Sequence, residues 1–186
     1  MARICMQALI LVLMMFSVAA DPVDDQQVQI AYKPLIVKKS LFGDFAMLAQ
    51  ERDEYATTLT RFSIESAHAK PTDKMVMESV RRLIGLALNL SPRNRSAVVA
   101  NHQLGRGILP EKKSADYSRP VFARLLLTRG RLLKEQKGEG NQFVGECFVE
   151  LAAELDPHNE DAVYECELQK LDEREVDWSV FTRQPE

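Results

Sequence analysis

From residue 40 onward, apolar residues recur every three or four positions, which is the period of an amphipathic α-helix. The first such stripe predicts a helix over residues 40–67; it comprises Leu41, Phe45, Leu48, Tyr55, Leu59 and Phe62. Five further helices are predicted over residues 73–91, 95–106, 120–137, 141–155 and 160–173, with Pro or Gly between them. Six helices with mostly short connections are expected to pack as antiparallel hairpins. The pattern therefore predicts an all-α fold for residues 40–174.

Two segments flank this helical domain. In residues 21–39, Val28, Ile30 and Tyr32 alternate with polar residues, and Pro34 then interrupts the pattern. This favours an extended arm or linker that lies on the helices, with an edge strand as the alternative. Residues 175–186 form a C-terminal tail that contains Trp178, the only Trp of the chain. The tail is expected to dock as a cap or to begin a second domain.

Residues 1–20 have the pattern of a secretory signal peptide. Arg3 precedes a long apolar stretch, and small residues lead up to Ala20 and Asp21. Cleavage near Ala20 would leave 166 residues, enough for one domain with a core of its own. The predicted location is therefore secreted or periplasmic. The alternative is an uncleaved anchor formed by residues 4–20, which is short for a membrane span.

Two stretches of the chain match each other, at residues 87–98 (ALNLSPRNRSAV) and 152–163 (AAELDPHNEDAV). Both combine the end of a helix, a Pro that cannot continue it, an Asn suited to capping, and small residues that open the next helix. They resemble the tetratricopeptide repeat family, a unit of about 34 residues made of two helices with a terminal Pro. The resemblance places Gly145, Val149 and Ala152 at the packing positions of one copy. In the other copy these positions hold Val80, Ile84 and Ala87.

The resemblance implies a solenoid of helix pairs, but the spacing departs from that pattern. Pro92 and Pro157 are almost two units apart, yet only three helices are predicted between them, whereas two units need four. Either a short helix lies within residues 107–118 or the superhelix is broken there. A generic helical bundle with two similar corners is the remaining alternative.

Charge is unevenly distributed along the chain. Residues 81–139 contain 13 basic and 4 acidic side chains, whereas residues 144–177 contain 12 acidic and 2 basic ones. A basic concave face formed by Arg106, Arg124, Arg131 and Lys134 would attract an acidic segment of a partner protein. Solvated helix faces are the plainer interpretation. Nucleic acid is not expected as a partner, because the chain is predicted to be exported and its basic stretch carries no interleaved aromatic platform.

The sequence carries no motif of a catalytic, phosphate-binding or paired-cysteine metal site, so no enzyme activity, cofactor or metal is predicted. Glu65 and His68 have a spacing found in carboxylate-bridged metal sites, but no second copy accompanies them. Cys147 and Cys166 are equidistant from the corner at Pro157. They could form a disulfide in an oxidising compartment or pack as buried thiols.

Taken together, the patterns predict an exported scaffold that mediates protein–protein interaction, since helical repeats build extended binding surfaces. Its expected partner is a protein or an acidic peptide segment, and a membrane only if the leader stays uncleaved. The alternative is the N-terminal helical region of a larger or truncated exported envelope enzyme.

Overall fold

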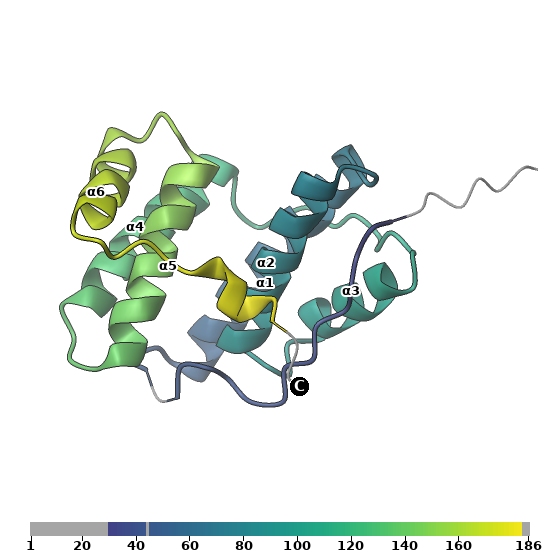
Figure 1. The fold of residues 1–186 in the computed structure, drawn as a ribbon, viewed down its shortest axis with the longest axis horizontal. Helices are drawn as coiled ribbons and strands as arrows, with labels where there is room; N and C mark the ends of the chain where they lie inside the picture. Colours follow the sequence, from purple (N-terminus) through teal and green to yellow (C-terminus); the bar gives the residue numbers. More distant parts are fainter. Residues whose placement is uncertain (1–29, 44, 184–186) are drawn as a thin grey trace, which may run out of the picture.

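The computed structural model describes residues 30–43 and 45–183, and this part of the chain is all-helical (Figure 1). Its elements are α1 (Ala49–Ala69), α2 (Lys74–Leu90), α3 (Arg95–Gly105), α4 (Arg119–Lys134), α5 (Glu139–Leu155), α6 (Glu160–Leu171) and the short 3-10 helix η1 (Trp178–Phe181). The described residues contain no strand. None of their helices has the length and apolar character needed to cross a membrane. The predicted leader and the start of the arm lie outside the described residues.

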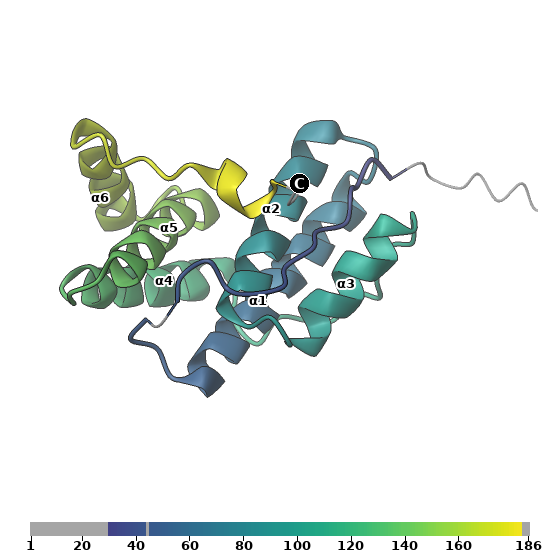
Figure 2. The ribbon, with the colours of Figure 1, turned by 60° about the horizontal axis from the view of Figure 1, so that its bottom comes forward.

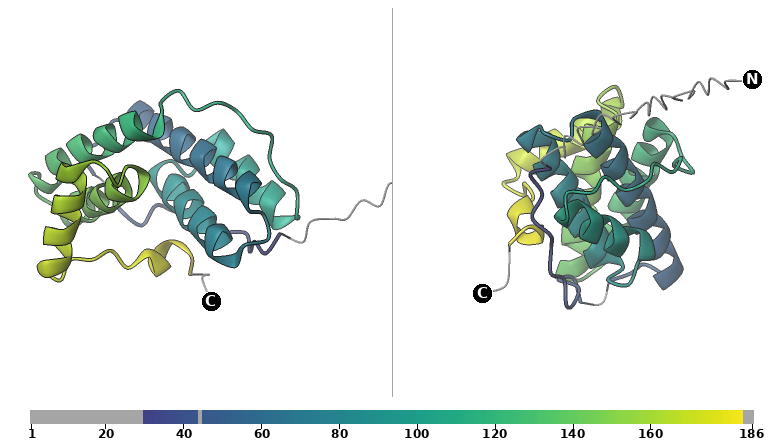
Figure 3. Two further views of the ribbon diagram at one scale, coloured as in Figure 1. Left: turned by 90° about the horizontal axis from the view of Figure 1, so that it is seen from above. Right: turned by 90° about the vertical axis from the view of Figure 1, so that its right-hand side faces the viewer.

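The helices form two groups of three. Helices α1 and α2 form one hairpin with α3 packed against both, and α4 and α5 form another with α6 packed mainly on α5. Seen from above, the two groups make an arch (Figure 3). Residues 106–118 connect the groups and contain no helix. The short helix that was one alternative for residues 107–118 is therefore absent from this described stretch.

Side-chain caps begin the helices at both Pro corners. The Asn94 side chain accepts a hydrogen bond from the Ala97 amide at 3.0 Å, and Asn159 accepts one from the Ala162 amide at 3.2 Å. These bonds satisfy amides that the first turn of a helix leaves without partners. The two matching stretches of sequence thus fold into corners with the same local chemistry.

Helices α4 and α5 cross closely at two glycines. A Cβ atom on Gly130 would lie 2.9 Å from the carbonyl oxygen of Gly145, and one on Gly145 would lie 2.8 Å from that of Gly130. Real side chains do not approach backbone atoms so closely, so the crossing requires glycine on both helices. Gly145 is one of the positions at which the tetratricopeptide resemblance implied close helix packing.

Aromatic side chains join the two groups through α1. Tyr55 stacks on Phe148 of α5, with ring centroids 5.2 Å apart, and both Tyr55 and Phe62 contact Phe122 of α4. Such pairs bury large apolar areas and add roughly 0.5–1.5 kcal/mol each beyond that burial. Helix α1 is therefore the centre of the molecule, in contact with α2, α3 and the second group.

The first predicted helix was wrong at its start, because α1 begins at Ala49 and not near residue 40. Leu41 and Leu48, two members of the predicted stripe, are 57% and 78% exposed. The side chains that are buried here are instead Phe42, Phe45 and Met47. The spacing of these three residues fits no single helix face. The chain between the arm and α1 is irregular and continues the course of the arm across the helices. The other predicted helices agree with the structure to within a few residues at their ends.

The arm runs over the helices as irregular chain, and the tail does so apart from η1 (Figure 2). Asn101 of α3 binds the arm, because it accepts hydrogen bonds from the Tyr32 hydroxyl and the Leu35 amide and donates one to the Leu35 carbonyl. The tail leaves α6 and crosses to α2, where Phe181 is buried. A Cβ atom on Gly85 of α2 would lie 2.8 Å from the Phe181 carbonyl oxygen, so this contact also requires glycine.

Candidate binding cleft

One face of α2 holds the arm and the tail next to each other. Arg81, Gly85 and Asn89 are one helical turn apart and therefore share a face. The Arg81 guanidinium donates to the Lys33 carbonyl of the arm at 2.8 Å and to the Thr182 carbonyl of the tail at 2.7 Å. A single arginine on this face thus ties the two segments to the same helix.

Asn89, on the same face of α2, also binds the chain that leads from the arm. Its side-chain oxygen accepts a hydrogen bond from the Leu41 amide at 2.9 Å, and its amide group donates to the Gly85 carbonyl at 2.8 Å. The residue is buried among the leucines at the end of α2. A buried amide is stable there because both ends of its side chain are bonded.

Between the arm and the tail lies a cleft of about 480 Å³. It is lined by Leu35, Ile36, Val37, Lys38, Lys39, Leu41, Asn89, Val180, Phe181 and Arg183. The volume falls within the range of about 300–1,000 Å³ that is typical of ligand-binding sites. Because most of its lining residues are aliphatic or aromatic, the cleft is apolar along most of its surface, and basic side chains stand at both walls.

The basic residues of the cleft differ in how they are paired. Arg183 forms an ion pair with Asp177 of the tail at 2.7 Å. Lys38 and Lys39 are exposed and have no acidic partner among residues 30–43 and 45–183. The arm wall thus presents two positive charges beside an apolar surface, an arrangement that favours a ligand with both apolar and acidic groups.

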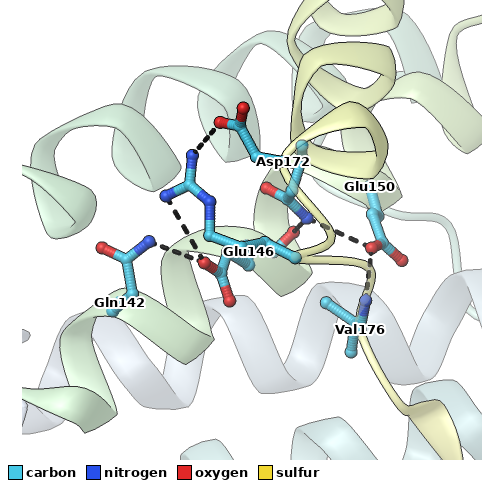
Figure 4. Close-up of polar contacts among 7 residues, drawn as sticks. Gln142, Glu146, Glu150, Asp172 and Val176 are labelled. Atoms are coloured by element: carbon cyan, nitrogen blue, oxygen red, sulfur yellow. Dashed lines mark hydrogen bonds and ion pairs between the residues drawn. The ribbon is translucent and has the colours of Figure 1, made fainter.

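A buried carboxylate fixes the tail in place. Glu150 of α5 is 7% exposed and accepts a hydrogen bond from the Val176 amide at 2.7 Å (Figure 4). It also accepts one from the Trp178 indole at 2.7 Å and one from the Gln169 side chain at 3.1 Å. Three donors satisfy a carboxylate that would otherwise be costly to bury. The second wall of the cleft is therefore anchored to α5 as well as to α2.

Glu146 lies one turn before Glu150 and also faces donors of its own. The Gln142 side chain donates to it at 2.6 Å, and the Arg174 guanidinium lies 3.9 Å away while pairing with Asp172 at 2.6 Å (Figure 4). Both carboxylates of this cluster are thus engaged in contacts that hold α6 and the tail.

Arg82 supports the same tail from the side of α2. Its guanidinium lies over the Trp178 ring, 4.6 Å from the centroid, and pairs with Glu154 of α5 at 2.5 Å. A cation over an indole face is attracted by the ring quadrupole. The contact links α2, α5 and the tail at the open side of the arch.

The four residues of the predicted basic face lie in different settings. Arg106 is the C-cap of α3, in the first group of helices, whereas the other three lie on α4 in the second. Arg131 pairs with Glu165 of α6, and the methylene chain of Lys134 is packed over Gly145. Arg124 is exposed. The structure therefore places three of these residues on α4 and the fourth, Arg106, at the end of α3 in the other group of helices.

Cys147 and Cys166 are buried on the adjacent helices α5 and α6, and they are not bonded to each other in this structure. Burial raises the pKa of the Cys147 thiol well above its ordinary value, and the charges of Glu150 and Glu146 raise it further. Burial also raises the pKa of Cys166. Thiols held protonated in this way are poor nucleophiles. Whether the two cysteines pair in an oxidising compartment stays a prediction.

Glu65 and His68 serve as structural contacts of the loop that joins the two groups. His68 Nε2 lies 2.7 Å from the Pro110 carbonyl oxygen, and Glu65 pairs with Arg119 at 2.9 Å. The part of the chain that the structure describes contains no group of three or more acidic, His or Cys residues arranged to hold a metal ion.

The cleft was not predicted from the sequence. Its lining comes from the arm, the end of α2 and the tail, which are far apart along the chain. The available signals were an Asn within an apolar helix and two lysines next to Pro34 and its apolar neighbours. Comparisons with protein-family models, with curated proteins and with solved structures each find no significant match to this chain.

Proposed function

We propose that this chain is a protein-binding module, without catalytic activity of its own, that receives an acidic segment of a partner protein in the cleft between the arm and the tail. The observation that carries the proposal is the cleft itself, with apolar walls and with Lys38 and Lys39 unpaired among the described residues. An acidic partner was expected from the charge pattern of the sequence. The proposal keeps that partner and moves its site from α4 to the arm.

Two features support a preformed binding surface. The arm is bonded to α2 and α3 through Arg81, Asn89 and Asn101, and the tail is bonded to α5 through Glu150. A ligand would therefore meet walls that are already ordered, which lowers the entropic cost of binding. The buried carboxylates of α5 are committed to these contacts, which supports binding over catalysis.

We also propose that the two three-helix groups are diverged relatives of tetratricopeptide repeats, and that the chain is exported. The matching caps at Asn94 and Asn159 and the close glycine crossing of α4 and α5 support the first proposal. The leader pattern of residues 1–20 supports the second. Intact-mass analysis of exported protein should find a chain that begins at or next to Asp21. Retention of Met1 on membrane-bound protein would favour the anchor instead.

The binding proposal is tested by selecting displayed random peptides on the purified chain and measuring the affinity of the enriched ones. We expect acidic, apolar peptides whose affinity falls about tenfold in the Lys38→Glu/Lys39→Glu variant and becomes less dependent on salt. The matched control is Arg106→Glu/Arg124→Glu, which changes the net charge equally at exposed positions outside the cleft. Loss of binding in the control alone would assign the site to the basic face, and no enrichment of any peptide would refute the proposed function.

A further inference from the structure

The outer face of α6 carries an apolar stripe. Tyr164, Leu168 and Leu171 lie at spacings of four and three residues, so they share one side of the helix. They are 65%, 40% and 79% exposed, whereas Ala162 and Cys166 on the opposite side are buried against the second group. A surface helix usually turns polar residues to solvent. Helix α6 therefore has apolar side chains on two sides, of which only one is covered within the described part of the chain.

Acidic residues surround this stripe. Residues 156–175 contain eight acidic and two basic side chains. Glu160 lies one turn before Tyr164 on the same face, is exposed, and forms no ion pair with any described residue. The outer surface of α6 is therefore apolar along one stripe and negatively charged beside it.

Helix α3 presents a face of the opposite charge. Val98 and Val99 are each 45% exposed, and the exposed side chains of Arg95 and His102 flank them on the same side of the helix. Residues 91–109 contain three arginines and no acidic residue. None of these arginines forms an ion pair within the part of the chain that the structure describes. The outer face of α3 thus combines apolar surface with unpaired positive charge.

A hollow of about 340 Å³ adjoins Val99. It lies between α3, α1 and the loop that joins the two groups of helices, and its walls include Ile64, Gln103 and Pro110. Walls that are partly apolar and partly polar suit a tyrosine, which has an apolar ring and a polar tip. Tyr164 is such a side chain, and it is exposed on the acidic face of α6.

Figure 1 and Figure 2 show α3 and α6 at opposite ends of the arch. Helix α3 contacts only α1 and α2 among the described elements, and α6 contacts only α4 and α5. The two faces of one molecule therefore do not meet. Two copies that paired through the same face would oppose acid to acid or arginine to arginine, which is unfavourable. Contact between α6 of one copy and α3 of another instead pairs opposite charges and covers apolar side chains on both sides.

We infer that the chain associates with itself head to tail, with the outer face of α6 of one copy docked on the outer face of α3 of the next. A helix that ends a stack of helices needs a polar outer face to remain apart from other copies, and neither of these end faces is polar throughout. A contact between two different faces leaves one face of each kind free, so further copies add to the assembly or close it into a ring. The cleft takes no part in this contact, because it lies between the arm and the tail.

Two variants test the contact, each of which blocks one face. Arg95→Glu/Val98→Glu places acidic side chains on the α3 face. Tyr164→Gln/Leu168→Gln/Leu171→Gln removes the apolar stripe of α6 without adding charge. Glu and Gln favour helix, so these exposed positions tolerate them.

Sedimentation velocity at low ionic strength measures association from about 10 µM to about 1 mM protein. We expect the wild-type chain to exceed the mass of a dimer as its concentration rises, and each variant alone to associate at least about tenfold more weakly. An equimolar mixture of the two variants should form a 1:1 dimer and no larger species, because the intact α6 face of the first meets the intact α3 face of the second. Formation of this dimer also shows that both variants are folded.

The matched control is Val121→Glu/Arg124→Glu, which makes the same kind of change at the same spacing on α4, away from both end faces. It should associate like the wild-type chain. A wild-type chain that stays monomeric up to about 1 mM would overturn the inference, as would equal weakening in the control. Dimerisation of one variant alone as strongly as the wild-type chain, or a mixture that stays monomeric, would overturn the head-to-tail contact in favour of pairing between like faces. The proposed cleft has its own test in the displayed peptides, which is carried out at concentrations where the chain is monomeric.

Discussion

Asn94 and Asn159 occupy equivalent corners of the two helical groups but have different surroundings. Both cap the helix that follows. Asn94 is 2% exposed, and its amide nitrogen also donates to the Asp53 carbonyl, to the Asp53 carboxylate and to the Thr57 hydroxyl, at 2.8–3.1 Å. Asn159 is only half-buried and makes no such contact among the described residues. Replacing each by alanine therefore separates the cap from the contact with α1.

The expected magnitudes follow from these contacts. Loss of a side-chain cap costs about 1 kcal/mol, so Asn159→Ala should lower the free energy of unfolding by about that amount. An amide has two N–H groups, so its three contacts amount to at most two good hydrogen bonds. These add about 1 kcal/mol each, with more for the charged Asp53 partner. Asn94→Ala should therefore cost about 3 kcal/mol.

Urea denaturation followed by far-UV circular dichroism measures both variants against the wild-type chain. Equal losses for Asn94→Ala and Asn159→Ala would refute the argument, because the contacts with α1 would then contribute nothing. A double-mutant cycle between Asn94→Ala and Asp53→Ala gives an independent check. A coupling energy of about 1 kcal/mol or more is expected from the direct contact.

Three further predictions concern pH, packing and the thiols. Burial raises the pKa of Tyr55 to about 12, so the folded chain holds this proton more tightly than the unfolded chain, and stability is lost as pH rises from 10 to about 12. Tyr55→Phe should reduce this alkaline loss of stability in a series of denaturation curves recorded at increasing pH. An unchanged dependence of the free energy of unfolding on pH would contradict the assignment. Gly130→Ala should lower the free energy of unfolding by about 1–3 kcal/mol in urea denaturation, since the new methyl group would meet the Gly145 carbonyl. A gain of stability, as expected for an open helix position, would show that α4 and α5 can move apart to accept the methyl group. A disulfide between Cys147 and Cys166 predicts no alkylation of unreduced, denatured protein from an oxidising compartment, whereas two alkylated cysteines detected by mass spectrometry would establish free thiols.

The helices after α1 were predictable because their signals are local. Asp73 and Asn94 cap their helices through their own side chains, and Pro92 and Pro157 stop the preceding ones wherever the rest of the chain lies. The start of α1 was not predictable in this way. Spacings of three and four residues also occur by chance in an arm that buries Phe42 and leaves Leu41 exposed. Only contacts with distant elements decide between the two, and these are absent from a local pattern.

The cleft was beyond sequence reasoning for a similar reason. Gly85 looks like a weak point within an apolar helix until the tail is seen to pack on it. Arg81 looks like one of many basic residues, but its guanidinium joins carbonyl groups from residues 33 and 182. A carbonyl acceptor carries no side-chain signature, so such contacts leave no trace in the sequence.

The uneven charge of the sequence is in part satisfied inside the molecule. Arg82 and Arg131 belong to the basic stretch and pair with Glu154 and Glu165 of the acidic one. Arg129 pairs with Glu51 of α1. Opposite charges on different helices favour the correct docking of those helices. The separation of basic and acidic residues along the chain can therefore arise without any external partner. Charge available to a partner is then better sought among residues that have no such counterpart, and the lysines of the arm satisfy this condition within the described part of the chain.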